Sequence, residues 1–191
     1  RKSKNKTFGT IVIPVYLSEI SENINDQILA SKFSDVWKII LALKSQDDSL
    51  MEEIDTLRVS LGQRRTGGNG GKGIQKVILD FPEKISISFA DKFQTILIKN
   101  TSDVWFERFG ELKLFVENNG HASPSCKSIE FKSLGDWCVE QRKNQRKNKL
   151  SQERIDLLNS ITFDWDPKET DWQNNFSELK EFKKKHGHAS P

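Results

Sequence analysis

The 191-residue sequence has few of the residues that build covalent or metal-linked scaffolds. It contains two cysteines, Cys126 and Cys138, three histidines and no Cys-x-x-Cys pair. A disulfide framework or a structural zinc site needs more such residues at closer spacing. We therefore expect an intracellular, reducing environment of unspecified compartment, and no metal site.

Long apolar runs are also absent. No stretch approaches the roughly 20 apolar residues that span a bilayer, and residues 1–9 are basic and polar rather than an apolar leader. We predict no membrane partner. Formal net charge is only +3, so an argument for nucleic-acid binding depends on where the charges lie.

What the sequence does have is a repeat. Residues 105–124, WFERFGELKLFVENNGHASP, return as residues 172–191, WQNNFSELKEFKKKHGHASP. The two copies share Trp, Phe, Glu-Leu-Lys, Phe and the closing Gly-His-Ala-Ser-Pro, which is 11 of 20 positions. Such an ungapped match indicates an internal repeat. Since the second copy stops at the last residue and the first residue is Arg1, we expect a piece of a longer protein.

The first half of the chain mixes one predicted strand with helices. Residues 10–17 are apolar and β-branched, which is typical of a buried strand, although Pro14 favours an edge or a bulge. Apolar residues then recur at helical spacing over 28–43. The pair Asp47-Asp48 predicts the start of a second helix that ends near Gly62.

Residues 63–73, QRRTGGNGGKG, predict a flexible linker, because five of the eleven are Gly. A phosphate-binding loop is the alternative. The Walker pattern requires Gly where Thr66 stands and Ser or Thr where Gly73 stands, and no hydrophobic strand precedes the run. A short extended segment is expected at 76–81, followed by a helix at 89–99, and residues 100–103 supply N-cap chemistry for the next helix.

The region that starts with the first copy predicts three helices. The first carries Trp105, Phe109, Leu112 and Phe115 on one stripe and ends at Gly120. The second begins near Ser133 with an apolar side made by Leu134, Trp137 and Cys138. The third begins at the N-cap Ser151, with Ile155, Leu158 and Ile161 inward, and Phe163 and Trp165 close the unit. Asp171 is expected to start the next copy.

The candidate nucleic-acid site is the basic tail of the second helix. Five cations occur in nine residues without an acid: Arg142, Lys143, Arg146, Lys147 and Lys149. Such a helix end can neutralise phosphates. The alternative is a solvated face whose cations complement the helix C-terminus. Residues 101–191 hold 15 Lys/Arg and 15 Asp/Glu, so the region is neutral as a whole. Lys183, Lys184 and Lys185 lie on a different helix, where solvation is expected.

Aromatic and histidine side chains have two interpretations each. Trp105, Trp137, Trp165 and Trp172 could stack on bases, but their place on apolar stripes favours core packing. His121 and His188 follow Gly in both copies. No partner ligands recur near them, which favours a hydrogen-bonded loop histidine over a metal or acid–base role. Cys138 is expected to be buried as a small apolar residue.

The repeat pattern resembles the helicase-associated domain, a three-helix module found in tandem after the motor of some superfamily 2 helicases. The matching elements are W-x3-F-x2-L-x2-F-x4-GH, LG-x-W-x3-QR, LS-x-ERI-x2-L and F-x-WD, at residues 105–121, 134–142, 150–158 and 163–166. Thr162 departs from the family, which more often has Gly there. The resemblance implies a mainly α fold and a nucleic-acid-binding role.

The N-terminal part resembles the end of the second RecA-like motor domain of the same helicases, and Arg1 then stands where motif VI places its last arginine. The domains implied are a motor end and helices at 1–62, a linker at 63–73, a connection at 74–100, one module at 101–166 and the start of another at 167–191. We expect an accessory region that positions DNA or RNA for an upstream ATP- and Mg²⁺-dependent motor, without catalytic residues or cofactors of its own. The alternative is a protein-interaction module that docks on the motor or a partner.

Overall fold

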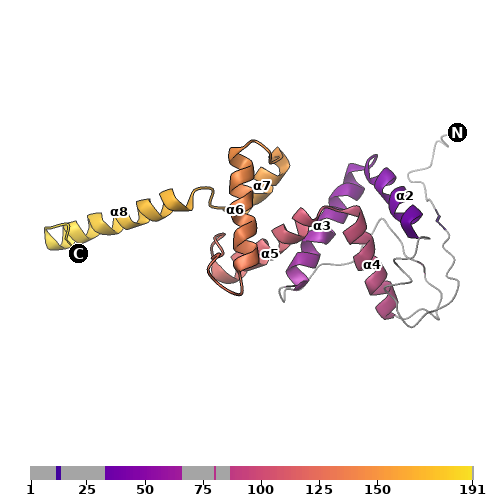
Figure 1. Cartoon of the computed structure of the whole chain (residues 1–191), viewed down its shortest axis with the longest axis horizontal. Coiled ribbons are helices and arrows are strands. Elements are labelled where there is room, and N and C mark those ends of the chain that lie inside the picture. Colours follow the sequence, from indigo (N-terminus) through magenta and orange to yellow (C-terminus); the bar gives the residue numbers. More distant parts are fainter. Residues whose placement is uncertain (1–11, 14–32, 66–79, 81–86, 191) are drawn as a thin grey trace, which may run out of the picture. The chain divides into compact units, whose positions relative to one another are not determined.

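The computed structural model describes residues 12–13, 33–65, 80 and 87–190 (Figure 1). All regular structure in these ranges is α-helical, which confirms the predicted mainly α fold. None of these helices is long and apolar enough to cross a membrane. The helices are α2 (Ser34–Lys44), α3 (Asp48–Arg65), α4 (Ile87–Thr101), α5 (Val104–Asn119), α6 (Lys132–Arg146), α7 (Gln152–Ser160) and α8 (Pro167–His186).

Several predictions fall outside the described residues. The extended segment at 76–81 is described only at Asp80, and most of the linker and of the strand at 10–17 lie outside as well; Val12 and Ile13 are described and belong to no strand. Helix α3 begins as predicted, because the carboxylate of Asp47 accepts hydrogen bonds from the backbone N–H groups of Ser49 (3.0 Å) and Leu50 (3.1 Å). The predicted end near Gly62 is wrong, since the helix continues to Arg65.

The chain divides into two compact units, and the first contains α2, most of α3 and α4. Its core is aromatic: the Phe93 ring on α4 lies 5.1 Å from that of Phe33 and 5.4 Å from that of Trp37, centroid to centroid. A largely buried ion pair joins Lys44 Nζ to Asp55 at 2.6 Å, and the same ammonium donates to the carbonyl oxygen of Thr101 at 3.1 Å. This cation therefore ties the ends of α2 and α4 to α3.

The prediction that residues 100–103 cap the next helix is wrong for Asn100 and Thr101. Asn100 and Thr101 belong to the end of α4, and their side chains donate to the carbonyl oxygens of Ile96 and Leu97 at 2.8 Å. Ser102 does the same toward Ile98. Short polar side chains in a last helical turn can bond back to the carbonyl four residues earlier. Asn100 and Thr101 therefore bond within the end of α4 and do not cap α5.

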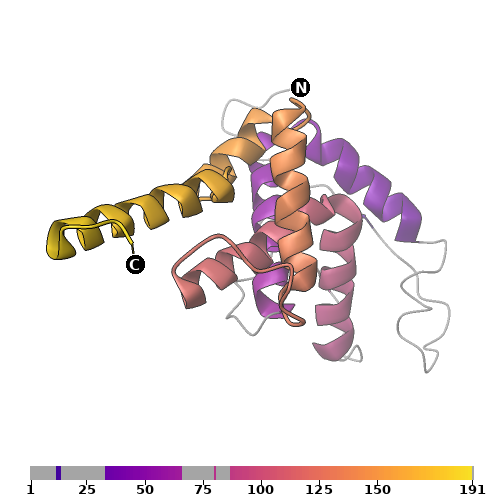
Figure 2. The same ribbon diagram turned by 60° about the vertical axis from the view of Figure 1, so that its left-hand side comes forward.

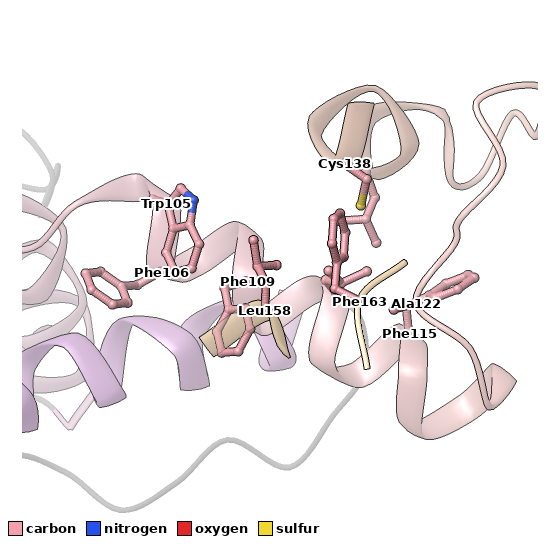
Figure 3. Packing of buried hydrophobic residues seen from close by; sticks show 10 residues of the cluster. Trp105, Phe106, Phe109, Phe115, Ala122, Cys138, Leu158 and Phe163 are labelled. Carbon is pink, nitrogen blue, oxygen red and sulfur yellow. The ribbon is translucent and has the colours of Figure 1, made fainter. Parts of the chain in front are cut away.

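The second unit holds α5, α6, α7, α8 and the last turns of α3. The predicted stripe of α5 is confirmed: Trp105, Phe109, Leu112 and Phe115 are all buried (Figure 3). Opposite them, α6 contributes Leu134 and Cys138, α7 contributes Leu158, and Phe163 follows α7. Burial of this one continuous apolar cluster closes three short helices into a module.

Turns in the module use left-handed backbone conformations. Gly120 ends α5 with φ +75°, as predicted, and its N–H donates to the carbonyl of Val116. Thr162 stands at φ +57° just before Phe163. A β-branched residue is disfavoured in this conformation. The departure from Gly at position 162 therefore stores local strain.

Helix α8 repeats the sequence of α5 but begins at Pro167, four residues before the predicted start at Asp171. Asp166 is its N-cap and accepts a hydrogen bond from the N–H of Glu169 at 3.4 Å. Pro at the first helical position costs no intrahelical hydrogen bond. Figure 2 shows α8 as one uninterrupted helix, and it ends at Gly187 with φ +79°.

Candidate nucleic-acid interface

Helix α6 separates an inward side from its basic tail. Leu134, Gly135, Cys138 and Gln141 are buried, at the three- and four-residue steps of one helical face. The five candidate cations begin immediately after Gln141 and continue past the end of the helix. The structure gives them three different environments.

Arg142 is built into the module. Its Nε donates to the carbonyl oxygen of Asp164 at 2.7 Å, and its guanidinium lies 4.9 Å from the centroid of the Phe163 ring. Its Nη2 is buried and has no hydrogen-bond partner. The side chain thus joins α6 to the segment that follows α7, and little of it is available to an external phosphate.

Lys143 is exposed but already paired. Its ammonium lies 3.2 Å from the carboxylate of Glu140, one turn earlier on α6. An exposed pair at this spacing contributes only a few tenths of a kcal/mol. The pair therefore lowers the local positive potential without fixing Lys143 in place.

Arg146, Lys147 and Lys149 form a distinct group, here called the cationic turn (residues 146–149). All three side chains are exposed, and within the described part of the chain none of them makes an ion pair. The backbone is held by hydrogen bonds from the N–H of Asn148 to the carbonyl of Gln145 and from the N–H of Lys149 to that of Asn144, both at 2.9 Å. The cationic turn is a defined loop that presents three uncompensated charges.

The N-terminus of α7 follows this turn directly. Ser151 caps it, with its hydroxyl accepting from the N–H of Arg154 at 3.4 Å, which confirms the predicted cap. The positive end of the α7 dipole adds to the three cations. The exposed carboxylate of Glu153 in the first turn opposes them. The local potential is therefore positive over a small area.

The tryptophans do not share one environment. Trp105 is a core residue, as predicted: it is 5 % exposed, and its Nε1 donates to Gln141 Oε1 at 2.8 Å. Trp137 and Trp165 are partly buried against the same core. The core prediction is wrong for Trp172, which is 55 % exposed and stacks on Phe176 with ring centroids 5.0 Å apart. No described helix covers that face of α8.

The His121 prediction is confirmed. Its Nδ1 accepts a hydrogen bond from the N–H of Ser123 at 3.2 Å, and its ring meets Phe115 edge to face. His188 contacts Phe182 in the corresponding way, at 5.5 Å. In the described ranges no three His, Cys, Asp or Glu side chains gather as a metal site would require.

One buried thiol and one surface pair complete the electrostatics. Cys138 is 1 % exposed, as predicted, and desolvation raises the pKa of its thiol to about 12. Lys132 and Asp136 bond at 2.6 Å on the exposed side of α6. That hydrogen bond raises the pKa of Lys132 and lowers the pKa of Asp136. The Cys126 thiol also lies beside this pair, and its hydrogen bond contributes to the lowered pKa of Asp136.

Gln141 is a buried polar residue that was not predicted to lie in the core. Its side chain accepts the hydrogen bond from the Trp105 indole. The signal was available, because Gln141 lies three residues after Cys138 and seven after Leu134, on the same helical face. A buried indole N–H needs an acceptor, and this glutamine is the acceptor.

Comparison with known proteins identifies the central module. Residues 102–166 match the family model of the helicase associated domain. This is the segment that contains α5, α6, α7 and the cationic turn. No curated protein matches the chain, and no solved structure does. The chain thus carries a helicase-associated region.

Proposed function

We propose that the helicase-associated module of this chain binds the phosphate backbone of DNA or RNA through the cationic turn. The observation that carries the proposal is the turn itself: Arg146, Lys147 and Lys149 are exposed and free of ion pairs among the described residues, next to the N-terminus of α7. Cations at a helix N-terminus are a favourable setting for phosphate oxygens. The family match supports a role beside a helicase.

Such binding is weak and independent of sequence. Three cations neutralise about three phosphates, and residues 101–191 as a whole hold 15 Lys/Arg and 15 Asp/Glu. Phosphate contacts position a nucleic acid without reading its bases. The described aromatic residues of the module pack within its core or against it. The module therefore holds a strand in place.

We further propose that the strand is held for an ATP-dependent motor of the superfamily 2 helicase type, encoded upstream of the module. The resemblance of the first residues to the end of a RecA-like domain supports this, with Arg1 at the position of the last motif VI arginine. ATP and Mg²⁺ belong to that motor. Residues 167–191 are then the start of a second module.

Binding of the 191-residue chain to short labelled DNA and RNA oligonucleotides at rising salt tests the proposal. The logarithm of the binding constant should fall linearly with the logarithm of salt, with a slope of about −2.7 for duplex DNA and about −2.1 for single strands if three phosphates are contacted. No measurable binding at low salt would refute the phosphate-contact role.

The second candidate function is protein docking, and one observation favours it. Helix α8 exposes Trp172 and Phe176, at 55 % and 38 %, on an otherwise polar surface. Exposed neighbouring aromatics are typical of protein interfaces. In that case pull-downs with the chain should recover a protein partner after nuclease treatment, and Trp172→Ala should abolish recovery. Loss of recovery on nuclease treatment would contradict docking.

A further inference from the structure

Helix α5 is buried on two sides, although a module of three short helices requires only one. The stripe of Trp105, Phe109, Leu112 and Phe115 faces α6 and α7. A second set of α5 residues, which lies between the stripe residues in sequence, is also buried: Phe106, Glu107, Gly110 and Glu111. Their exposed fractions are below one tenth, so this second side also has a cover.

The cover is the last part of α3. A Cβ on Gly62 would stand 1.9 Å from the carbonyl oxygen of Glu107, and a Cβ on Gly110 would stand 2.0 Å from the carbonyl oxygen of Val59. Both values are far below any real Cβ contact. The two backbones therefore touch at this crossing, and only glycine fits at either position.

The crossing is reciprocal. Gly62 of α3 contacts Glu107 of α5, and Gly110 of α5 contacts Val59 of α3. On each helix the glycine comes three residues after the residue that the other glycine contacts. This pattern is that of two antiparallel helices in direct contact. Val59 also packs against the module's apolar core.

Helix α8 lacks this second side. The positions equivalent to Phe106, Glu107 and Gly110 are Gln173, Asn174 and Ser177, and all three are exposed. The identities between α5 and α8 are concentrated on the first stripe. Of the residues that meet α3, Glu107 and Gly110 differ in the second copy, whereas Glu111 is kept as Glu178. Helix α5 thus has two distinct faces. One is the stripe that it shares with α8, and the other is the side that contacts α3.

We infer that α5 carries a docking face for the end of α3, and that residues 59–65 are a working part of this module although they precede the family-matched region. The partner that fits this face is a helix with glycine at the crossing point. The module is thereby fixed to the helix that precedes it in the chain, whereas the equivalent face of α8 is built for solvent. This inference does not depend on nucleic-acid binding.

Gly62→Ala and Gly110→Ala in the full chain test the inference by the sign of their effect. Alanine is the better helix former, so at an undocked, solvated position either change should raise thermal stability. At the crossing, the added methyl forces the backbones apart. We expect a lower Tm and a loss of amide protection at residues 59–65 of about tenfold or more. The matched control is Ser177→Ala, at the equivalent position of α8, which should leave Tm unchanged or higher.

A double-mutant cycle makes the test specific to the crossing. Because both methyls open the same contact, Gly62→Ala/Gly110→Ala should cost clearly less than the sum of the single changes. Loss of protection that extends into α6 also supports the inference, since it shows that the segment belongs to the module's fold. Unchanged or higher Tm in either single variant, or full additivity in the double variant, would overturn it.

Discussion

The side chain of Arg142 is fixed to the backbone of Asp164, because its Nε donates a hydrogen bond of 2.7 Å to that carbonyl oxygen. The same guanidinium covers the face of Phe163. In sequence, Arg142 is one of five cations in a row. In the structure it joins α6 to the segment after α7. We therefore expect phosphate binding by the tail to depend on the cationic turn.

This relationship predicts different outcomes for two neighbouring arginines. Arg142→Gln should lower the free energy of unfolding by about 1–3 kcal/mol, because it removes a charge-assisted hydrogen bond and a cation–π contact. Arg146→Gln removes an exposed charge and should change it by no more than about 0.5 kcal/mol. Denaturant unfolding of both variants measures the difference. Equal losses would contradict the structural role of Arg142.

The repeat offers a matched pair of tryptophans. Trp105→Ala should cost about 3–5 kcal/mol, because it opens a cavity beneath Phe109 and leaves Gln141 without its partner. Trp172 stands at the same position of the motif but on an exposed surface. Trp172→Ala should therefore lower the free energy of unfolding by no more than about 0.5 kcal/mol. Thermal unfolding monitored by circular dichroism compares them. A large loss for Trp172→Ala would show that its face is covered in solution.

Burial of Cys138 predicts a pH dependence at the alkaline end. The folded-state pKa is raised from 9.0 to about 12, so the folded chain holds this proton more tightly than the unfolded chain. The contribution to stability is therefore complete below about pH 9 and is lost between about pH 9 and about pH 12, at up to about 1.4 kcal/mol per pH unit.

The measurement is the free energy of unfolding against pH, for the native chain and for Cys138→Ala. The difference between the two curves isolates the thiol, because other groups titrate in both. The native chain should lose its advantage over the variant as pH rises above 9. Parallel curves across that window would contradict the burial-driven shift.

Helical periodicity was sufficient to predict the module's interior. Trp105, Phe109, Leu112 and Phe115 were expected on one stripe and form one, since a period of 3.6 residues leaves few other arrangements. The ends were less predictable. Gly120 correctly predicted the end of α5, because a residue in the left-handed conformation is required there. Gly62 wrongly predicted the end of α3, because the role of this glycine is close packing against α5.

For the candidate site, the sequence predicted the cluster of cations but not the orientation of each side chain. Five cations in a row carry no information on which of them turns inward, because that depends on where the helix ends and on the loop after α7. Arg142 lies before the end and reaches Asp164, and Lys149 lies after the left-handed Asn148 and remains exposed. Trp172 is a second example, because it was expected in the core and is exposed. An apolar stripe predicts burial only when a covering element is present.

The most direct test of the account compares two triple substitutions of equal charge. Arg146→Gln/Lys147→Gln/Lys149→Gln removes the cationic turn, and Lys183→Gln/Lys184→Gln/Lys185→Gln removes three cations from the end of α8, so each lowers the net charge by the same amount. Binding to labelled DNA and RNA is then measured by fluorescence anisotropy across a salt series. Loss of the turn should reduce affinity about tenfold or more at low salt and flatten the salt dependence, while the α8 variant keeps most of both. Equal losses in the two variants, or none in the first, would contradict phosphate binding by the turn.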